Sequence, residues 1–162
     1  MTYTEAELRR HCVCFTGHRP EKLALSENEV KERLSEQIRK AVSEGYTAFI
    51  TGMAKGVDLW AGQIVADLRD SGSEIRLIAA SPYEGFGKGW SPEWRSLYLE
   101  TLERADLVHY VCQEYNKGCF MTRNKWMVDH SSLVLAVYNG EKGGTRNTID
   151  YARKQGIEVR LI

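Results

Sequence analysis

Short apolar runs alternate along this chain with longer stretches in which apolar residues recur every three or four positions. Such runs are typical of buried strands, and the three-to-four spacing is typical of amphipathic helices. The runs predict about six strands, at residues 12–15, 46–51, 75–80, 106–111, 131–138 and 157–162. Because each run is apolar throughout rather than alternating, we expect a mostly parallel sheet with helices on both faces.

Local signals predict where the intervening helices begin and end. Ser26 and Glu29 form a capping-box pattern, and Gly45 has the usual place of a C-terminal glycine. Ser91 followed by Pro92 is typical of a helix start. Since no linker or internal repeat interrupts the alternation, residues 1–162 are predicted to form a single α/β domain of the Rossmann-like type.

Charge, apolar runs and cysteine spacing argue against some classes of binding partner. The 22 basic and 22 acidic residues cancel, which argues against a broad nucleic-acid or membrane surface. No apolar run reaches membrane-spanning length and residues 1–5 do not resemble a signal peptide, so we expect a cytoplasmic protein. The cysteines lack C-x-x-C spacing and are expected to be reduced and mostly buried, with no metal site; they are Cys12, Cys14, Cys112 and Cys119.

The loop that follows the first strand is the first candidate site. Thr16, Gly17, His18 and Arg19 place a hydroxyl, an imidazole and a guanidinium within four residues. Gly17 allows close approach of a ligand to the backbone, and Arg19 is suited to an anionic oxygen group. Pro20 should keep Arg19 extended and stop the chain from continuing into a helix. The alternative is an ordinary turn with a surface arginine.

A second candidate loop joins the second strand to the next helix. Gly52, Met53, Ala54 and Gly56 leave amide groups that can face an anion at a helix N-terminus. The loop matches neither the Walker A motif nor G-x-G-x-x-G. Asp58 follows in the first helical turn, where a carboxylate either stabilises the helix or accepts a hydrogen bond from a ribose or a base.

A third group of candidates surrounds the strand at residues 131–138. Gly143, Gly144 and Thr145 open the next helix in a way that suits a phosphate or a ribose, although flexible turns have the same composition. Arg123 and Asn124 precede the strand and form either a ligand contact or a solvated turn. Because ligands of such folds bind at the carboxyl ends of the strands, we expect all three glycine-bearing loops at one edge of the sheet.

The segment from Tyr83 to Trp90 differs from the predicted elements. It is rich in glycine and aromatic residues and has no periodicity, so we expect a mobile loop. Pro82, Tyr83 and Trp90 are placed to close the pocket and stack on a base. No catalytic motif with a nucleophile and a paired base is present.

The motifs together resemble the YpsA-like branch of the SLOG superfamily, which also includes the Smf/DprA proteins and the Lonely Guy phosphoribohydrolases. The resemblance covers nearly the whole chain and is carried by residues 16–20, 51–58, 123–127 and 143–145. It implies a Rossmann-like fold that binds a nucleotide or a nucleotide-derived small molecule and requires no cofactor.

Two positions depart from the patterns of these relatives. Arg123 matches the arginine of Lonely Guy enzymes, but the position of their catalytic glutamate is occupied by Thr148. A threonine cannot supply the negative charge that stabilises a developing oxocarbenium ion. Phe86 stands in the loop where the YpsA-like branch is expected to have a glutamine.

The first hypothesis is therefore a sensor or regulator that binds a nucleotide-type ligand without hydrolysing it. Arg19 and the Gly52–Gly56 amides would hold a phosphate, Asp58 the sugar, and residues 143–145 a second phosphate or the ribose. The alternative is a nucleoside-monophosphate phosphoribohydrolase that cleaves an N-glycosidic bond with Asp58 or Glu84, Arg123 assisting. A DNA-handling module of Smf/DprA type ranks third because the net charge is zero. The sequence leaves a homodimer open.

Overall fold

The centre of the structure is a six-stranded sheet in which all paired strands run parallel. The computed structural model describes residues 4–162. The strands are β1 (Cys12–Gly17), β2 (Ala48–Thr51), β3 (Arg76–Ser81), β4 (Leu107–Tyr110), β5 (Leu133–Val137) and β6 (Glu158–Leu161). Their order is β4-β3-β2-β1-β5-β6, so the direction of winding reverses between β1 and β5. The predicted Rossmann-like α/β fold is confirmed.

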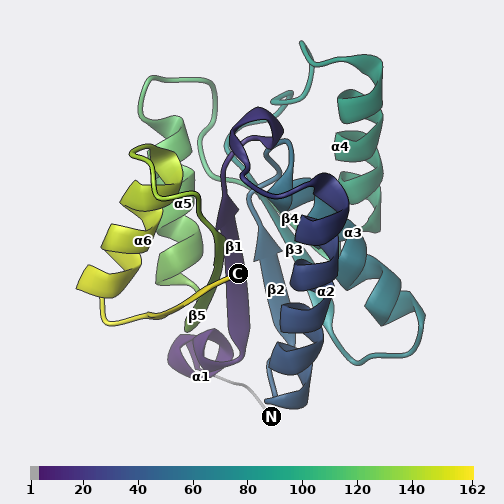
Figure 1. Ribbon diagram of the computed structural model, residues 1–162, viewed down its shortest axis with the longest axis vertical. Coiled ribbons are helices and arrows are strands. Elements are labelled where there is room, and N and C mark those ends of the chain that lie inside the picture. The colour runs from purple at the N-terminus through teal and green to yellow at the C-terminus, as the bar shows by residue number, and fades with distance from the viewer. Residues whose placement is uncertain (1–3) are drawn as a thin grey trace.

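Helices cover both faces of the sheet (Figure 1). They are α1 (Glu5–Arg10), α2 (Glu27–Ser43), α3 (Val57–Asp70), α4 (Pro92–Arg104), α5 (Cys119–Asp129) and α6 (Gly144–Lys154), with a short 3-10 helix at Pro20–Lys22. In Figure 1, α2, α3 and α4 lie on one side of the strands and α5 and α6 on the other.

Alternate residues of β1 supply the two halves of the core. Val13 and Phe15 pack with the layer of α2 and α3, whereas Cys12 and Cys14 pack with that of α5 and α6. Residues 133–137 of β5 are buried throughout, as predicted for a central strand. Each large side chain buried in this way stabilises the fold by roughly 1.5–3 kcal/mol.

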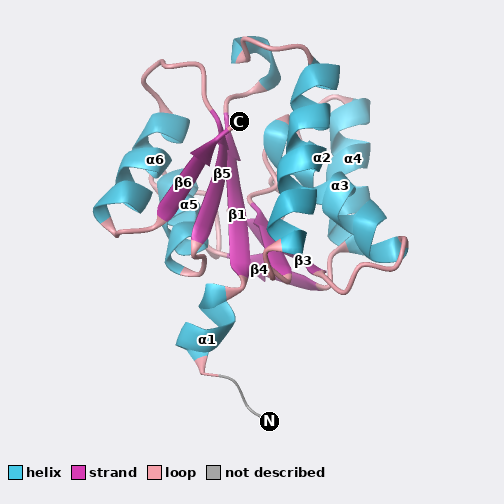
Figure 2. Cartoon of the chain, turned by 60° about the horizontal axis from the view of Figure 1, so that its bottom comes forward, coloured by secondary structure: helices cyan, strands magenta, loops and turns pink. Residues whose placement is uncertain are grey.

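Two features of the fold differ from the sequence prediction. Helix α1 was not predicted, although Thr4 and Glu7 form a capping box and each bonds to the backbone of the other. Strands β4 and β6 were predicted as buried apolar runs, but both lie at the edges of the sheet and are partly exposed. Figure 2 shows α1 projecting from the amino-terminal end of the sheet.

Several predicted boundaries shift by two residues. Strand β2 begins at Ala48 rather than at residue 46, because the Tyr46 amide still donates to Ala41 O at the end of α2. Pro20 does keep Arg19 extended, but it begins the 3-10 helix, so the prediction that it blocks a helical turn is wrong. Ser26 does cap α2 by accepting from the Glu29 amide at 3.2 Å.

Residues 4–162 contain no helix long and apolar enough to cross a membrane. Three of the four cysteines are buried, and no cluster of potential metal ligands occurs in the described part of the chain.

Candidate functional site

A pocket of about 390 Å³ lies at the carboxyl ends of the strands, where the winding reverses. This is the place where open α/β sheets bind ligands. The loops after β1, β2, β3 and β5 contribute to it, together with the first turns of α5. Its lining residues are Phe15, Thr16, Gly17, His18, Arg19, Glu21, Lys22, Ala54, Lys55, Asp58, Phe86, Trp90, Phe120, Arg123, Asn124, Lys142, Gly143, Gly144 and Thr145.

Most of the residues that the sequence nominated as ligand-binding come together in this pocket. Those that line it are Thr16, Gly17, His18, Arg19, Ala54, Asp58, Trp90, Arg123, Asn124, Gly143, Gly144 and Thr145. Those that do not line it are Gly52, Met53, Gly56, Pro82 and Tyr83. The second group supports the walls instead.

The glycines of the β2–α3 loop are required by packing. A Cβ on Gly52 would lie 2.7 Å from Asp58 Oδ2 and 3.1 Å from Arg123 Cδ. Gly56 has a φ of +91° and packs against Pro20 of the first loop. Met53 is fully buried and has a φ of +66°, a conformation that non-glycine residues rarely adopt. The loop is therefore held in a defined and partly strained shape.

Pro82 and Tyr83 lie behind the residues that line the aromatic end of the pocket. The carbonyl of Pro82 accepts from the Cys112 amide at 2.8 Å. The Tyr83 ring packs edge-on against Phe86 and Tyr115, with centroids 5.6 and 5.7 Å apart. These contacts position Phe86, which does line the pocket.

Two buried side chains of opposite charge, Arg123 and Asp58, brace the β2–α3 loop; they make no direct ion-pair contact within the described residues, but each lies in the field of the other's charge. The Arg123 guanidinium donates through Nη1 to Gly52 O and through Nε to Asn124 Oδ1 at 2.7 Å. Asp58 accepts the Ala54 amide at Oδ2, at 3.3 Å. Within residues 4–162, no hydrogen bond engages Asp58 Oδ1 or Arg123 Nη2. Since both residues line the pocket, these two atoms remain for a ligand.

Burial sets the protonation behaviour of this pair. It raises the pKa of the Asp58 carboxyl from 3.8 to about 6, against the opposing effects of the Arg123 charge and the Ala54 amide. Burial also lowers the pKa of Arg123, and the negative charge of Asp58 opposes that change. An arginine stays protonated in proteins, so the pair carries opposite charges at neutral pH.

Two helix N-termini face the pocket. Gly56 and Gly143 are the N-cap residues of α3 and α6, and as glycines they have no side chain that could accept from the first helical amides. Gly143 has a φ of +149°, which suits glycine. The Leu59 amide of α3 donates to Ala54 O at 3.3 Å, whereas within the described residues no hydrogen bond engages the amides of residues 57 and 58 in α3 or of residues 144–146 in α6. These amides can donate to an anion, which the helix dipoles also favour.

Basic side chains lie at the same end of the pocket. Lys22 and Lys142 line the pocket beside Arg19, which is exposed, and Glu21 is the only acid among these surface groups. Lys55 places Nζ 5.2 Å from the centre of the Trp90 ring. None of these three lysines is among the candidates predicted from the sequence, although Lys55 lies inside the second candidate loop.

His18 is the least satisfied polar group of the site. It is 7% exposed and stacks on Tyr138 with ring centroids 5.5 Å apart. Its Nε2 has no hydrogen-bond partner within the described residues. Burial lowers the pKa of this imidazole, which favours the neutral ring.

The other end of the pocket is aromatic. Phe86 contacts Trp90 at 4.8 Å and Phe120 at 5.6 Å between ring centroids. Trp90 was nominated from the sequence, but Phe120, from the first turn of α5, was not. The prediction that residues 83–90 act as a mobile lid stays a prediction.

The position of the missing glutamate is closed to a ligand. Thr148 is fully buried, and its hydroxyl donates to Gly144 O at 2.8 Å within α6. Thr148 and Glu84 are both absent from the pocket lining.

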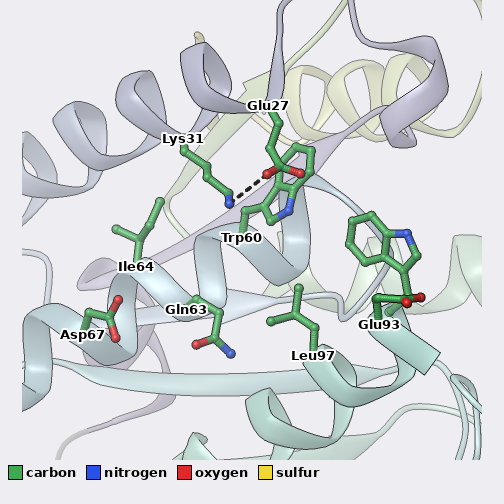
Figure 3. Close-up of a pocket in the computed structure, with 9 residues that line it drawn as sticks. Glu27, Lys31, Trp60, Gln63, Ile64, Asp67, Glu93 and Leu97 are labelled. Carbon is green, nitrogen blue, oxygen red and sulfur yellow. Dashed lines mark hydrogen bonds and ion pairs between the residues drawn. The ribbon is translucent and has the colours of Figure 1, made fainter. Parts of the chain in front are cut away.

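A second pocket, of about 370 Å³, opens within the helix layer between α2, α3 and α4 (Figure 3). It shares no lining residue with the strand-end pocket. Trp60, Ile64 and Leu97 form its apolar part, and the Lys31–Glu27 ion pair of 3.1 Å lies on its rim.

The fold and the strand-end pocket define a Rossmann-like protein with a pocket at the carboxyl edge of its sheet that is basic at one end and aromatic at the other. A family model named YpsA, described as the YspA SLOG family, matches residues 13–160, and the chain belongs to this family. The uncharacterized SPbeta prophage-derived protein YoqJ of Bacillus subtilis is 32% identical over 146 residues, covering 82% of this chain and 85% of that protein.

Solved structures of DNA processing protein A share the fold. The Streptococcus pneumoniae protein superposes with a TM-score of 0.66 and 17% identity, over 95% of this chain but only 50% of that one. The Helicobacter pylori protein, whose structure concerns a single-stranded DNA binding mode, gives a TM-score of 0.65 and 17% identity, over 97% and 66% of the two chains. The chain thus spans about half to two thirds of these larger proteins.

Proposed function

We propose that this protein binds a nucleotide or nucleotide-derived small molecule in the strand-end pocket and acts as a sensor or regulator in the cytoplasm. The main support for this proposal is that the two ends of the pocket differ in chemistry. One end combines basic side chains with the free amides of α3 and α6, and the other presents Phe86, Trp90 and Phe120. A ligand with both phosphate and a flat ring satisfies both ends.

The middle of the pocket suits the sugar. The carboxylate oxygen Asp58 Oδ1 can accept a hydrogen bond from a ribose hydroxyl, and Arg123 Nη2 can donate to an oxygen beside it. Both side chains are held in place by the β2–α3 loop that they brace. This preorganisation lowers the entropic cost of binding.

Arg19→Ala tests the anionic end. We expect affinity for the nucleotide to fall by about 1.5–3 kcal/mol, the contribution of a charge-assisted hydrogen bond, with little loss of stability because Arg19 is exposed. Isothermal titration calorimetry measures the change. Arg33→Ala, which removes an exposed arginine of α2 outside the pocket, is the matched control. Equal affinity in both variants would remove Arg19 from the site.

A second candidate function is hydrolysis of an N-glycosidic bond, and Asp58 is the feature that favours it. A carboxyl whose pKa lies near 6 and whose free oxygen faces a pocket is typical of general acids and bases. Thr148 supplies no charge, so Asp58 would have to act alone beside Arg123.

We expect negligible release of free base from purine or pyrimidine monophosphates, because the carboxylate at the position of Thr148 is missing. Chromatography of the reaction mixture detects the free base. Turnover that is abolished by Asp58→Asn, with Thr148→Ser as an active control, would instead establish the hydrolase.

A third candidate ligand is single-stranded DNA, because the Helicobacter pylori protein, whose structure concerns a single-stranded DNA binding mode, has the same fold. A salt-dependent affinity for single-stranded DNA, weakened by Arg19→Ala, would favour it over a free nucleotide.

A further inference from the structure

Strand β4 is an unprotected edge of the sheet. Among residues 4–162, three of the seven exposed large apolar residues lie in this four-residue strand: Leu107 (56% exposed), Val108 (36%) and Tyr110 (38%). The remaining residue, His109, stacks on Trp126 with ring centroids 4.6 Å apart. The strand contains no proline and no lysine, arginine or acidic residue.

The opposite edge provides the contrast. Strand β6 carries Glu158 and Arg160, and Arg160 bonds both to Glu158 at 2.7 Å and to Glu44 at 2.6 Å. Charged residues on an edge strand are a common means by which proteins prevent pairing with another chain. The two edges of the sheet therefore differ: edge strand β6 carries charged side chains, whereas edge strand β4 carries apolar side chains and no charged ones.

We propose that the protein forms a homodimer in which β4 pairs antiparallel with β4 of a second copy, across a two-fold axis, to give a continuous sheet. An uncharged strand can face its own copy without placing like charges opposite each other. In a two-fold interface both subunits use the same surface, so this pairing gives a dimer and does not extend to further chains. The unpaired backbone groups of the two edges would satisfy one another.

Hydrophobic burial supports the second copy as occupant. Leu107, Val108 and Tyr110 project to both faces of the sheet, since successive strand residues alternate. The pairing therefore brings apolar side chains together above and below the joined strands. This interface is independent of the strand-end pocket, because none of these residues lines it.

Leu107→Lys tests the proposal, and Leu161→Lys is its matched control. Leu161 has nearly the same exposure, 57%, but lies on β6. Sedimentation velocity should give twice the monomer mass of 18.5 kDa for the unmodified protein and for Leu161→Lys. In Leu107→Lys, we expect the dimer dissociation constant to rise about tenfold or more, because each copy would place a charged lysine among the apolar side chains of the joined strands, opposite the end of the partner's β4.

Hydrogen exchange of the unmodified protein provides a measurement that does not depend on a variant. Amides of residues 107–110 should exchange more slowly in concentrated than in dilute solution, while those of residues 158–161 should not change. A monomer at every concentration would overturn the proposal. A dimer that survives Leu107→Lys, or is lost equally in Leu161→Lys, would also overturn it.

Discussion

Arg123→Met should destabilise the protein by about 2–4 kcal/mol, the scale for removing one partner of a buried charged pair. The substitution removes the donors to Gly52 O and Asn124 Oδ1 and leaves Asp58 without its nearby positive charge. The same changes loosen the β2–α3 loop, so ligand affinity should fall as well. Urea denaturation measures the stability.

A double-mutant cycle separates the role of the pair from simple loss of packing. In the Asp58→Asn background no buried carboxylate remains for Arg123 to neutralise, so Arg123→Met should cost at least about 1 kcal/mol less there than in the unmodified protein. Arg33→Met on the surface of α2 is the control for a general effect of the substitution. Strictly additive effects would contradict the role of Arg123 as the counter-charge of Asp58.

Asp58→Asn should stabilise the protein at neutral pH. The pKa of Asp58 is raised in the fold, so the folded state binds this proton more tightly than the unfolded chain. The contribution of Asp58 to stability is therefore full below pH 3.8 and is lost as the pH rises through about 6. Each pKa unit corresponds to about 1.4 kcal/mol, which gives a difference of up to roughly 3 kcal/mol at neutral pH.

Denaturation curves of Asp58→Asn and of the unmodified protein between pH 4 and pH 8 measure this difference. The difference in unfolding free energy should be largest at pH 8 and should fall towards zero at pH 4. Burial lowers the pKa of His18, so the contribution of His18 to protein stability is lost as the pH falls. This contribution is the same in both proteins and cancels when their stabilities are subtracted. Asp150→Asn, at an exposed position of α6, should follow the unmodified protein. A constant difference across this range would show that Asp58 does not titrate as described.

The sequence predicted the sheet and the position of the pocket because both depend on local patterns. Uninterrupted apolar runs such as residues 133–137 require burial on two faces, and glycines at strand-to-helix junctions mark where backbone must turn. The carboxyl ends of parallel strands meet at one edge, so Gly17, Ala54 and Gly143 had to come together.

What the sequence did not predict depends on packing between distant segments. Phe120 lies at the aromatic end only because α5 packs beside the loop at residues 83–90. Gly52 and Gly56 were nominated as ligand contacts, but the structure uses their missing side chains to accommodate Asp58 and Pro20. The exposure of β4 and β6 likewise follows from strand order, which hydrophobic pattern alone does not determine.

Binding of a nucleotide-type ligand in the strand-end pocket is tested most directly by thermal unfolding. The unmodified protein and Arg19→Ala are compared in the presence of a panel of nucleotides and nucleotide-derived metabolites. A ligand that binds only the folded state raises the melting temperature in proportion to its saturation. We expect at least one compound with both phosphate and a base to stabilise the unmodified protein and to stabilise Arg19→Ala clearly less. No stabilisation by any compound, or an equal effect in both proteins, would contradict binding in this pocket.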